Sequence, residues 1–273
     1  MIFTKNKLAL FGLFVLAVLI FVSLFAFYLA PFDPSTLHLE EGLNGPSRHH
    51  PFGQDKLGRD ILSRMVYGSR ISLFVGLTVV SISLIVGVTI GSIAGYSGGV
   101  VDEGIMRIVD VFLAFPGILL AIAITAVLGP SLRNVLIALC LMGWVGYARI
   151  IRGQILSVRE LEYVQAARTI GASPLRILIR HILPNIMAPV IIEATFGMAG
   201  AITAEAGLSF LGLGVQPPTP SWGSMLAEGR QFLLMAPHLT TFPGLAIMFT
   251  VLGLNFLGDG LRDAMDVRQT GRE

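Results

Sequence analysis

Side chains that could take part in chemistry are sparse in this sequence, and their types favour ion pairing and partner contacts over catalysis. Charged residues make up 13% of the 273 positions. No lysine occurs in a Gly-x-x-x-x-Gly-Lys-Ser/Thr loop, the arrangement that holds nucleotide phosphates. The polar segments contain no Ser/His/Asp or paired-carboxylate spacing, and Cys140 is the sole cysteine. The sequence therefore predicts that this chain is not an enzyme and that it holds no catalytic residue and no metal site.

Two acidic residues fall inside apolar stretches, where an unpaired carboxylate is costly. Glu193 and Glu205 lie in the hydrophobic run at about residues 186–206, and an ionisable residue within a membrane span is a candidate functional site. We expect Glu193 about two turns from the cytoplasmic end of that span, within reach of Arg180 or of a neighbouring subunit. Glu205 is expected near the outer end. Two roles stay open for both residues, lining a solute pathway or forming a structural pair.

A polar loop at residues 31–70 gathers a second set of such side chains. His49 and His50 could suggest a metal site, but adjacent residues of an extended chain point in opposite directions, so binding one ion with both is awkward. A surface or packing role is therefore favoured for the two histidines. Arg59 and Asp60 are expected to satisfy each other and the nearby backbone.

Residues 157–185 form the longest polar segment in the second half of the chain, and they predict two short helices that meet at a corner. Ser157 and Glu160 have the spacing of a capping box, which predicts a helix start. Gly171 suits the left-handed residue that follows a helix. Such a hairpin, rich in arginine, is suited to binding a partner protein in the cytoplasm.

The second arm of this hairpin has start and stop signals of its own. Ser173 offers an N-cap, and Pro174 suits the first helical position, where a missing N–H costs nothing. Pro184 is expected to stop or kink the helix. The predicted hairpin therefore ends where the following apolar run begins.

The elements that position these residues are predicted to be membrane-spanning helices. The sequence is 54% hydrophobic, and a soluble domain of this size would need more charged surface. Several apolar runs have about 20 residues, the length that crosses about 30 Å of hydrocarbon as a helix. We predict an all-α integral membrane protein with six spans, at about residues 8–30, 71–95, 109–128, 133–151, 186–206 and 242–260.

The connections between spans carry further expectations. Residues 100–112 are expected to form a short helix on the cytoplasmic face, and Pro116 with Gly117 is expected to kink the third span. Lys5 and Lys7 precede the first span. An even number of spans puts both termini on one side, and the excess of Lys and Arg on that side indicates the cytoplasm.

The hairpin resembles the EAA loop of ATP-binding-cassette (ABC) importer permeases. The resemblance rests on Gln165-Ala166-Ala167 followed by Gly171, and on Ile182-Leu183-Pro184. Gln165 stands where the family pattern has Glu, and the isoleucine lies one position late, with His181 in its usual place. In that family the loop forms the coupling helix that docks into a groove on the ATPase subunit. The resemblance implies this role for Glu162, Gln165, Ala166, Ala167, Gly171, Leu183 and Pro184.

A segment before the second span resembles one permease type of the dipeptide, oligopeptide and nickel importers. It carries the residues of that pattern at the family's spacing, namely His50, Phe52-Gly53, Asp55, Gly58-Arg59-Asp60 and Ser63-Arg64. Two readings of Gly58, Arg59, Asp60 and Arg64 stay open, in which they only fold the periplasmic loop or also bind a ligand.

Residues 207–241 resemble the outward segment of the same permease family. This stretch contains GLSFLGLGVQPPTPSWGSMLAEGRQFL, whose glycines allow chain reversal where the backbone faces protein or a water-filled cavity. Its tryptophan suits a membrane interface. The resemblance implies a translocation pathway or outer gate formed by Glu205, Ser209, Phe210, Gly212, Gly214 and Trp222.

Together the resemblances imply the type I permease fold of ABC importers, with a cytoplasmic coupling-helix hairpin. Residues 1–70 would form an N-terminal span with its periplasmic loop, and residues 71–273 the transport core. The implied function is a permease subunit of a heteromeric, ATP-driven importer that moves dipeptides or oligopeptides across the bacterial inner membrane. Its implied partners are membrane lipid, a homologous second permease, two ATP-binding subunits and a periplasmic or lipid-anchored binding protein, with no nucleic acid. No cofactor is expected in this chain, because ATP and Mg²⁺ would bind the ATPase subunits.

Three alternatives stay open at this point. The first is the permease of a nickel or metal-chelate ABC importer. The second is a stand-alone secondary transporter, which would more usually show inverted repeats and broken helices in matching halves. The third is a membrane scaffold that binds partners and moves no solute.

Overall fold

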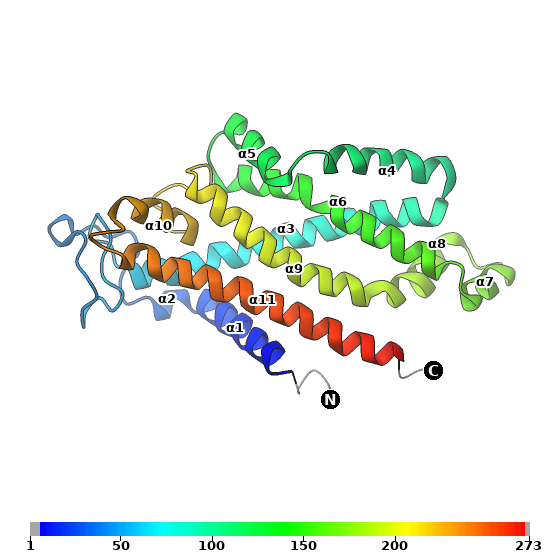
Figure 1. Ribbon diagram of the computed structural model, residues 1–273, viewed down its shortest axis with the longest axis horizontal. Helices are drawn as coiled ribbons and strands as arrows, with labels where there is room; N and C mark the ends of the chain where they lie inside the picture. Colours follow the sequence, from blue (N-terminus) through cyan, green and yellow to red (C-terminus); the bar gives the residue numbers. More distant parts are fainter. Residues whose placement is uncertain (1–5, 271–273) are drawn as a thin grey trace.

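The computed structural model describes residues 6–270, with side chains described up to Met265. Residues 1–5 and 271–273, which include Lys5 and the outer ends of the two predicted domains, lie outside this range. The described residues are mainly helical and include no strand (Figure 1). Their α-helices are α1 (Lys7–Leu24), α2 (Ala26–Leu29), α3 (Ile61–Ser97), α4 (Gly99–Leu113), α5 (Gly117–Leu128), α6 (Leu132–Val158), α7 (Glu162–Thr169), α8 (Pro174–Ile177), α9 (Leu183–Phe210), α10 (Trp222–Gly229) and α11 (His238–Thr270). The all-α prediction is confirmed.

Long apolar helices account for the predicted spans. Among the described residues, five helical stretches, built on α1, α3, α6, α9 and α11, are long and apolar enough to cross a membrane. α4 and α5 pass the same test only together, and they are bent by 77° at their junction. Pro116 lies at this break, as predicted, because a proline cannot donate the backbone hydrogen bond that would continue α4. Counting the bent pair as one span gives the predicted six.

The long helices lie roughly side by side, and their connections gather at two ends (Figure 1). The loop between α2 and α3 and helix α10 lie at one end, called the loop end. Helices α7 and α8 lie toward the other, called the hairpin end. α1 begins and α11 ends toward the hairpin end, so the two described chain ends lie on the same side of the bundle (Figure 1).

Helices α3 and α6 approach each other closely because glycines of α3 face α6. A Cβ atom on Gly91 would lie 2.9 Å from the Cβ of Ile151, and one on Gly95 would lie 3.0 Å from the Cβ of Ile155. Small residues of this kind allow van der Waals packing between helices where lipid supplies no hydrophobic driving force. This contact fixes the position of α6, the helix that leads into the hairpin.

Several predicted boundaries are wrong because the helices extend beyond the apolar runs. α3 begins at Ile61 and not near residue 71, so Arg64 belongs to its first turn and the polar loop is shorter than predicted. Asp60 caps this helix by accepting a hydrogen bond from the Ser63 N–H at 2.7 Å. α6 likewise continues to Val158. Apolar composition marks the part of a helix that hydrocarbon can surround, whereas capping and packing decide where the helix ends.

The short helix predicted at residues 100–112 is present as α4, and its position at the cytoplasmic face stays a prediction. This helix runs alongside α3 and α6 (Figure 1). Arg152 of α6 holds it by donating to the Asp102 carboxylate, with distances of 2.5 Å from Nε and 2.6 Å from Nη2. Val109 of α4 is fully buried. An ion pair and an apolar contact therefore bind α4 along the bundle.

The first and last spans are joined by direct backbone contact. A Cβ atom on Gly12 of α1 would lie 2.7 Å from the Leu257 nitrogen of α11 and would collide with the Gly253 carbonyl oxygen. A Cβ atom on Gly253 would lie 2.7 Å from the Cγ1 of Val15. Because backbone atoms cannot move aside as a flexible side chain can, α1 and α11 keep this spacing only with glycine at these positions.

We predict that Gly12→Ala forces α1 away from α11 and destabilises the protein by about 1–3 kcal/mol, the usual cost of overpacking. Thermal unfolding of the purified protein in detergent measures the effect. Gly104→Ala in α4 is the matched control, because a Cβ atom there meets no other atom within 4 Å. Equal melting temperatures for the two variants would contradict the packing argument.

Candidate functional site

The hairpin end contains the two short helices that the sequence predicts, α7 and α8. Gly171 has φ +81°, the left-handed conformation predicted for it, and its N–H donates to the Arg168 carbonyl oxygen at 2.9 Å. Pro174 lies in the first turn of α8, as predicted. Ser173 stands at the N-cap position, but its side chain makes no capping hydrogen bond. Backbone conformation, and not a side-chain cap, therefore sets the corner.

The start and the end of the hairpin differ from the predictions. Ser157 does not cap a helix, because α6 continues through it and its hydroxyl donates to the Gln154 carbonyl oxygen at 2.8 Å. α7 begins at Glu162 and follows Leu161. Of the two effects predicted for Pro184, a stop is wrong, because residues 178–182 form one π-helical turn and α9 continues directly from it. A π turn lets a helix continue past such a local irregularity.

An apolar cluster fixes the hairpin to the bundle. Val164 of α7 and Ile177 of α8 are buried in one cluster with Ile151 and Ile155 of α6. Ala167, one of the predicted coupling residues, is buried in the same cluster. Because close-packed side chains transmit displacement, the hairpin and the end of α6 form one mechanical unit.

The tip of the hairpin carries the exposed members of the predicted coupling set. Glu162, Ala166 and Gly171 are exposed, and Ile170 beside them is 84% exposed. Partial burial raises the pKa of the neighbouring Tyr163 hydroxyl from its ordinary value. The tip is therefore an accessible surface of mixed apolar and polar character.

The remaining members of the predicted set lie elsewhere on the hairpin. Gln165 is half-buried and donates from Nε2 to the Arg159 carbonyl oxygen at 3.2 Å and to Glu160 Oε2 at 3.3 Å. Gln165 therefore ties α7 to the preceding turn. Leu183 and Pro184 lie past the π turn at the start of α9, and the tip does not include them.

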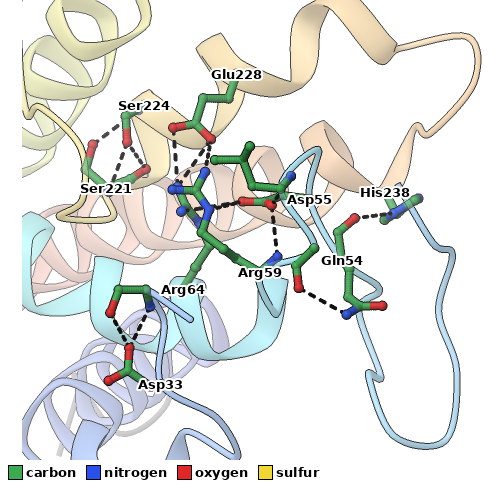
Figure 2. Close-up of polar contacts among 12 residues, drawn as sticks. Asp33, Gln54, Asp55, Arg59, Arg64, Ser221, Ser224, Glu228 and His238 are labelled. Atoms are coloured by element: carbon green, nitrogen blue, oxygen red, sulfur yellow. Dashed lines mark hydrogen bonds and ion pairs between the residues drawn. The ribbon is translucent and has the colours of Figure 1, made fainter. Parts of the chain in front are cut away.

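At the loop end, a buried network of charges joins the loop to α10 (Figure 2). Arg59 donates from Nε to Asp55 Oδ2 at 2.6 Å and from Nη2 to Glu228 Oε2 at 2.6 Å. Arg64 lies 3.4 Å from each of the same two oxygens. Two buried guanidinium groups are thus matched by two carboxylates. Removing one partner would leave a buried charge without compensation, which is costly.

The prediction that Arg59 and Asp60 satisfy each other is wrong. Asp60 accepts a hydrogen bond from Ser63 Oγ at 2.7 Å, and its other oxygen lies 2.9 Å from His50 Nδ1. The His50 ring stacks on Phe32, with ring centroids 4.6 Å apart. Arg59 and Asp60, although adjacent, thus make different contacts. Arg59 pairs with a residue of α10, whereas Asp60 caps α3 and contacts His50 of the loop.

The rest of the loop is shaped by local turns. Gly58 has φ +73°, and a Cβ atom there would collide with the His38 carbonyl oxygen. Asp33 accepts hydrogen bonds from the Ser35 hydroxyl and amide, which lower the pKa of the Asp33 carboxyl from its usual value. His49 is exposed. Among the described side chains, which end at Met265, no three His, Cys, Asp or Glu residues gather as a metal site would require.

Three of the predicted gate residues have buried, hydrogen-bonded side chains. Glu205 is fully buried and accepts a hydrogen bond from Ser209 Oγ at 2.7 Å. The same hydroxyl oxygen accepts one from the Val215 N–H at 3.1 Å. Trp222 is 4% exposed, and its Nε1 donates to the Met65 carbonyl oxygen at 3.0 Å. These contacts bind the connection between α9 and α10 to the bundle.

The other three predicted gate residues form the turn after α9. Gly212 has φ +81° and is exposed. Gly214 packs so closely on Ser209 that a Cβ atom would lie 2.7 Å from the Ser209 Cα. Phe210 is exposed, and the Arg230 guanidinium lies 5.4 Å from its ring centroid. A gate function for this segment stays a prediction.

A cavity of about 280 Å³ lies between α3, α5, α6 and α9. Its walls are rich in glycine, and at Gly117, Gly146 and Gly200 a Cβ atom would meet no other atom within 4 Å. Glycine walls leave the backbone accessible and the space free of side chains. The space next to these three glycines is therefore not filled by side chains.

Polar groups on three different helices reach this cavity: Ser83 on α3, Tyr147 on α6 and Glu193 on α9. Glu193 lies about three turns into α9, which begins at Leu183. The described ion pairs include none between Glu193 and Arg180, so a neighbouring subunit stays open as its predicted partner.

The sequence contained a signal for this cavity that the predictions did not use. Small residues follow Glu193 on one face of α9, at Gly197, Gly200, Ala204 and Gly207. This spacing of three and four residues places them in one stripe along the helix. The matching glycines of α6, at 143 and 146, could be assigned to the same space only from the folded chain.

The long spans and the hairpin define a class of membrane-protein fold that is also found in a solved ABC transporter. The structure is similar to one titled "Inward facing conformations of the MetNI methionine ABC transporter", in its CY5 native crystal form, with a TM-score of 0.59. The sequences are 19% identical, and the match covers 73% of this chain and 95% of that chain. This likeness confirms the predicted type I permease fold.

Sequence comparison gives the family. Residues 87–271 match the family described as "Binding-protein-dependent transport system inner membrane component". Residues 1–46 match the "N-terminal TM domain of oligopeptide transport permease C". The chain belongs to the family of binding-protein-dependent transport system inner membrane components, which confirms the resemblance drawn from the motifs.

Relatives match along nearly the whole chain. One is the dipeptide transport system permease protein DppC of Alkalihalophilus pseudofirmus, 49% identical over 96% of this chain and 86% of the relative. Another is the glutathione transport system permease protein GsiD of Escherichia coli O6:K15:H31, 46% identical over 98% of this chain and 89% of the relative. A third is the di/tripeptide transport system permease protein DppC of Pseudomonas aeruginosa, 45% identical over 97% of this chain and 89% of the relative.

We predict that Glu228→Gln destabilises the loop end, because Arg59 and Arg64 then share a single carboxylate. The expected loss of stability is about 1–3 kcal/mol, measured by thermal unfolding in detergent, with faster proteolytic cleavage in the loop between α2 and α3. Glu40→Gln is the matched control, because Glu40 is exposed in the same loop. Unchanged stability and cleavage of the Glu228 variant would show that the network does not hold the loop.

Proposed function

We propose that this chain is one of two permease subunits in a heteromeric, ATP-driven importer of dipeptides and short oligopeptides. The observation that carries the proposal is the near full-length similarity to permeases named for dipeptide, di/tripeptide and glutathione transport. Their named solutes are all short peptides, which makes peptide the preferred solute over nickel or a metal chelate. Membership of the permease family favours an importer over a secondary transporter or an inert scaffold.

The partners follow from the two ends of the bundle. The hairpin tip would dock on an ATPase subunit in the cytoplasm, where ATP and Mg²⁺ would bind. The described chain ends would then also face the cytoplasm, since they lie toward the hairpin end (Figure 1). The loop end would face a periplasmic or lipid-anchored binding protein, and a homologous permease would complete the pathway in the inner membrane.

The mechanism uses the packing that joins the two ends. The buried cluster formed with Ile151 and Ile155 couples the hairpin to α6, and the π turn leads directly into α9. Both helices also line the cavity. Closure of the ATPase dimer would therefore displace α6 and α9 together, and the cavity between them would alternate between the two sides.

We predict that the tagged chain copurifies in mild detergent with a second permease and two ATPase subunits, and that the eluate hydrolyses ATP. Dipeptide uptake by cells should stop when ATP is depleted while the proton gradient is kept. Uptake that follows the proton gradient alone would instead support a secondary transporter. An unpartnered chain without ATPase activity would contradict the proposal.

We predict that Gly171→Asp uncouples ATP hydrolysis from uptake without preventing insertion. The substitution puts a side chain and a negative charge on the exposed corner, where a Cβ atom meets no other atom within 4 Å. Uptake by the reconstituted complex should fall about tenfold or more while ATPase activity persists.

Gly129→Asp is the matched control, because Gly129 also has a positive φ, +91°, with no atom within 4 Å of its Cβ position. It lies in the turn between α5 and α6, away from the hairpin. Equal uptake by the two variants would show that backbone strain, and not a docking surface, explains any loss.

A further inference from the structure

The cavity between α3, α5, α6 and α9 contains one ionisable carboxylate that forms no ion pair with a described residue. Glu193 lines the cavity and is partly exposed to it. Its backbone carbonyl lies 3.5 Å from the Tyr147 hydroxyl. The ion pairs formed by the described residues include none with the Glu193 carboxylate. An acidic side chain within a membrane-spanning helix is costly without a cation, which points to a ligand.

A second polar group in the same cavity is also unsatisfied. Ser83 is 1% exposed, and its hydroxyl oxygen has no hydrogen-bond partner among the described residues. Buried hydroxyl groups in folded proteins are nearly always hydrogen-bonded, so an orphaned one requires an explanation. Ser83 and Glu193 thus present an unused hydroxyl and an unused carboxylate to one space.

The size and the walls of the cavity restrict what could bind there. A volume of about 280 Å³ is near the lower limit of ligand pockets, so it admits a small molecule or one end of a larger one. At Gly117, Gly146 and Gly200 the walls offer backbone and open space, and apolar side chains line much of the rest. The few polar groups of the cavity are therefore the ones that could recognise a polar group shared by all solutes.

We propose that Glu193 binds the protonated α-amino group of a peptide during its passage through the permease. This inference rests on the proposed function and adds the group by which the pathway recognises the peptide. The α-ammonium group is the one cation that all unmodified peptides share. Ser83, at the wall of the same space, supplies a hydroxyl that has no partner among the described residues.

A metal ion is a poorer fit to this cavity. A metal site draws several oxygen, nitrogen or sulfur ligands from the protein. Glu193 is the sole His, Cys, Asp or Glu side chain among the residues that line this space. A single carboxylate suits an ammonium group, which needs one counter-ion and a few hydrogen-bond acceptors.

The experiment uses the complete complex in proteoliposomes, with its binding protein preloaded to equal occupancy with Ala-Ala or with N-acetyl-Ala-Ala. Glu193→Gln removes the charge at constant shape, and Glu193→Asp keeps it. Glu103→Gln, at an exposed position of α4, is the matched control. Assembly and ATPase activity are measured for each variant alongside uptake.

Glu193→Gln should lower Ala-Ala uptake about tenfold or more, the usual effect of losing a charged hydrogen-bond partner. Glu193→Asp should retain more uptake than Glu193→Gln, and assembly should be unchanged. The wild-type complex should deliver the acetylated peptide slowly, and Glu193→Gln should cause no further loss with it.

Normal Ala-Ala uptake by Glu193→Gln would overturn the proposal, as would an equal loss for both peptides. Failure of Glu193→Gln to assemble would assign the carboxylate to a contact with another subunit and would likewise overturn it. A wild-type complex that takes up neither peptide would overturn the proposed function itself. That result can be distinguished from a failure of the Glu193 proposal, because it is observed in the complex without any substitution.

Discussion

The inability of hydrocarbon to solvate charges and peptide groups constrains this whole molecule. It confines the long spans to helices, whose backbone hydrogen bonds are internal. It also places most charged side chains toward the ends of the bundle, where they pair with one another. Arg59 and Arg64 share two carboxylates at the loop end, and Arg152 holds Asp102 beside α6. Glu193 and Glu205, both within α9, are exceptions: Glu205 accepts a hydrogen bond from Ser209, whereas Glu193 lines the cavity.

Close helix packing is the second consequence of the same environment. Without a hydrophobic driving force between helices in lipid, association depends on van der Waals contact, which small residues increase. Gly91 and Gly95 bring α3 against α6, and Gly12 and Gly253 bring α1 against α11. Where glycines such as Gly146 and Gly200 face no neighbour, the same residue type leaves a space. Glycine therefore has two roles in this protein: it allows close contact between helices, and it leaves open space in the cavity.

The two ends of the molecule communicate through α6 and α9. The hairpin is packed on Ile151 and Ile155 of α6, and it continues through a π turn into α9. Further along α9, Glu205 is bound to Ser209, and the chain then turns back toward α10. A displacement of the hairpin thus reaches the cavity and the turn after α9 through continuous helices. This arrangement suits a permease that converts a movement at one face into access at the other.

The sequence by itself determined the helical class, the number of spans, the corner at Gly171 and the family, because these depend on local composition and on short motifs. It placed helix ends poorly, as at Ile61 and Val158, since capping and packing extend helices beyond their apolar runs. Only the tertiary structure decided which charges pair. Arg59 pairs with Glu228, which is 169 residues away in the sequence, and not with its neighbour Asp60. It also decided that Ser83, Tyr147 and Glu193 meet at one cavity. Such contacts depend on the distances between helices, and the order of residues along the chain does not encode these distances locally.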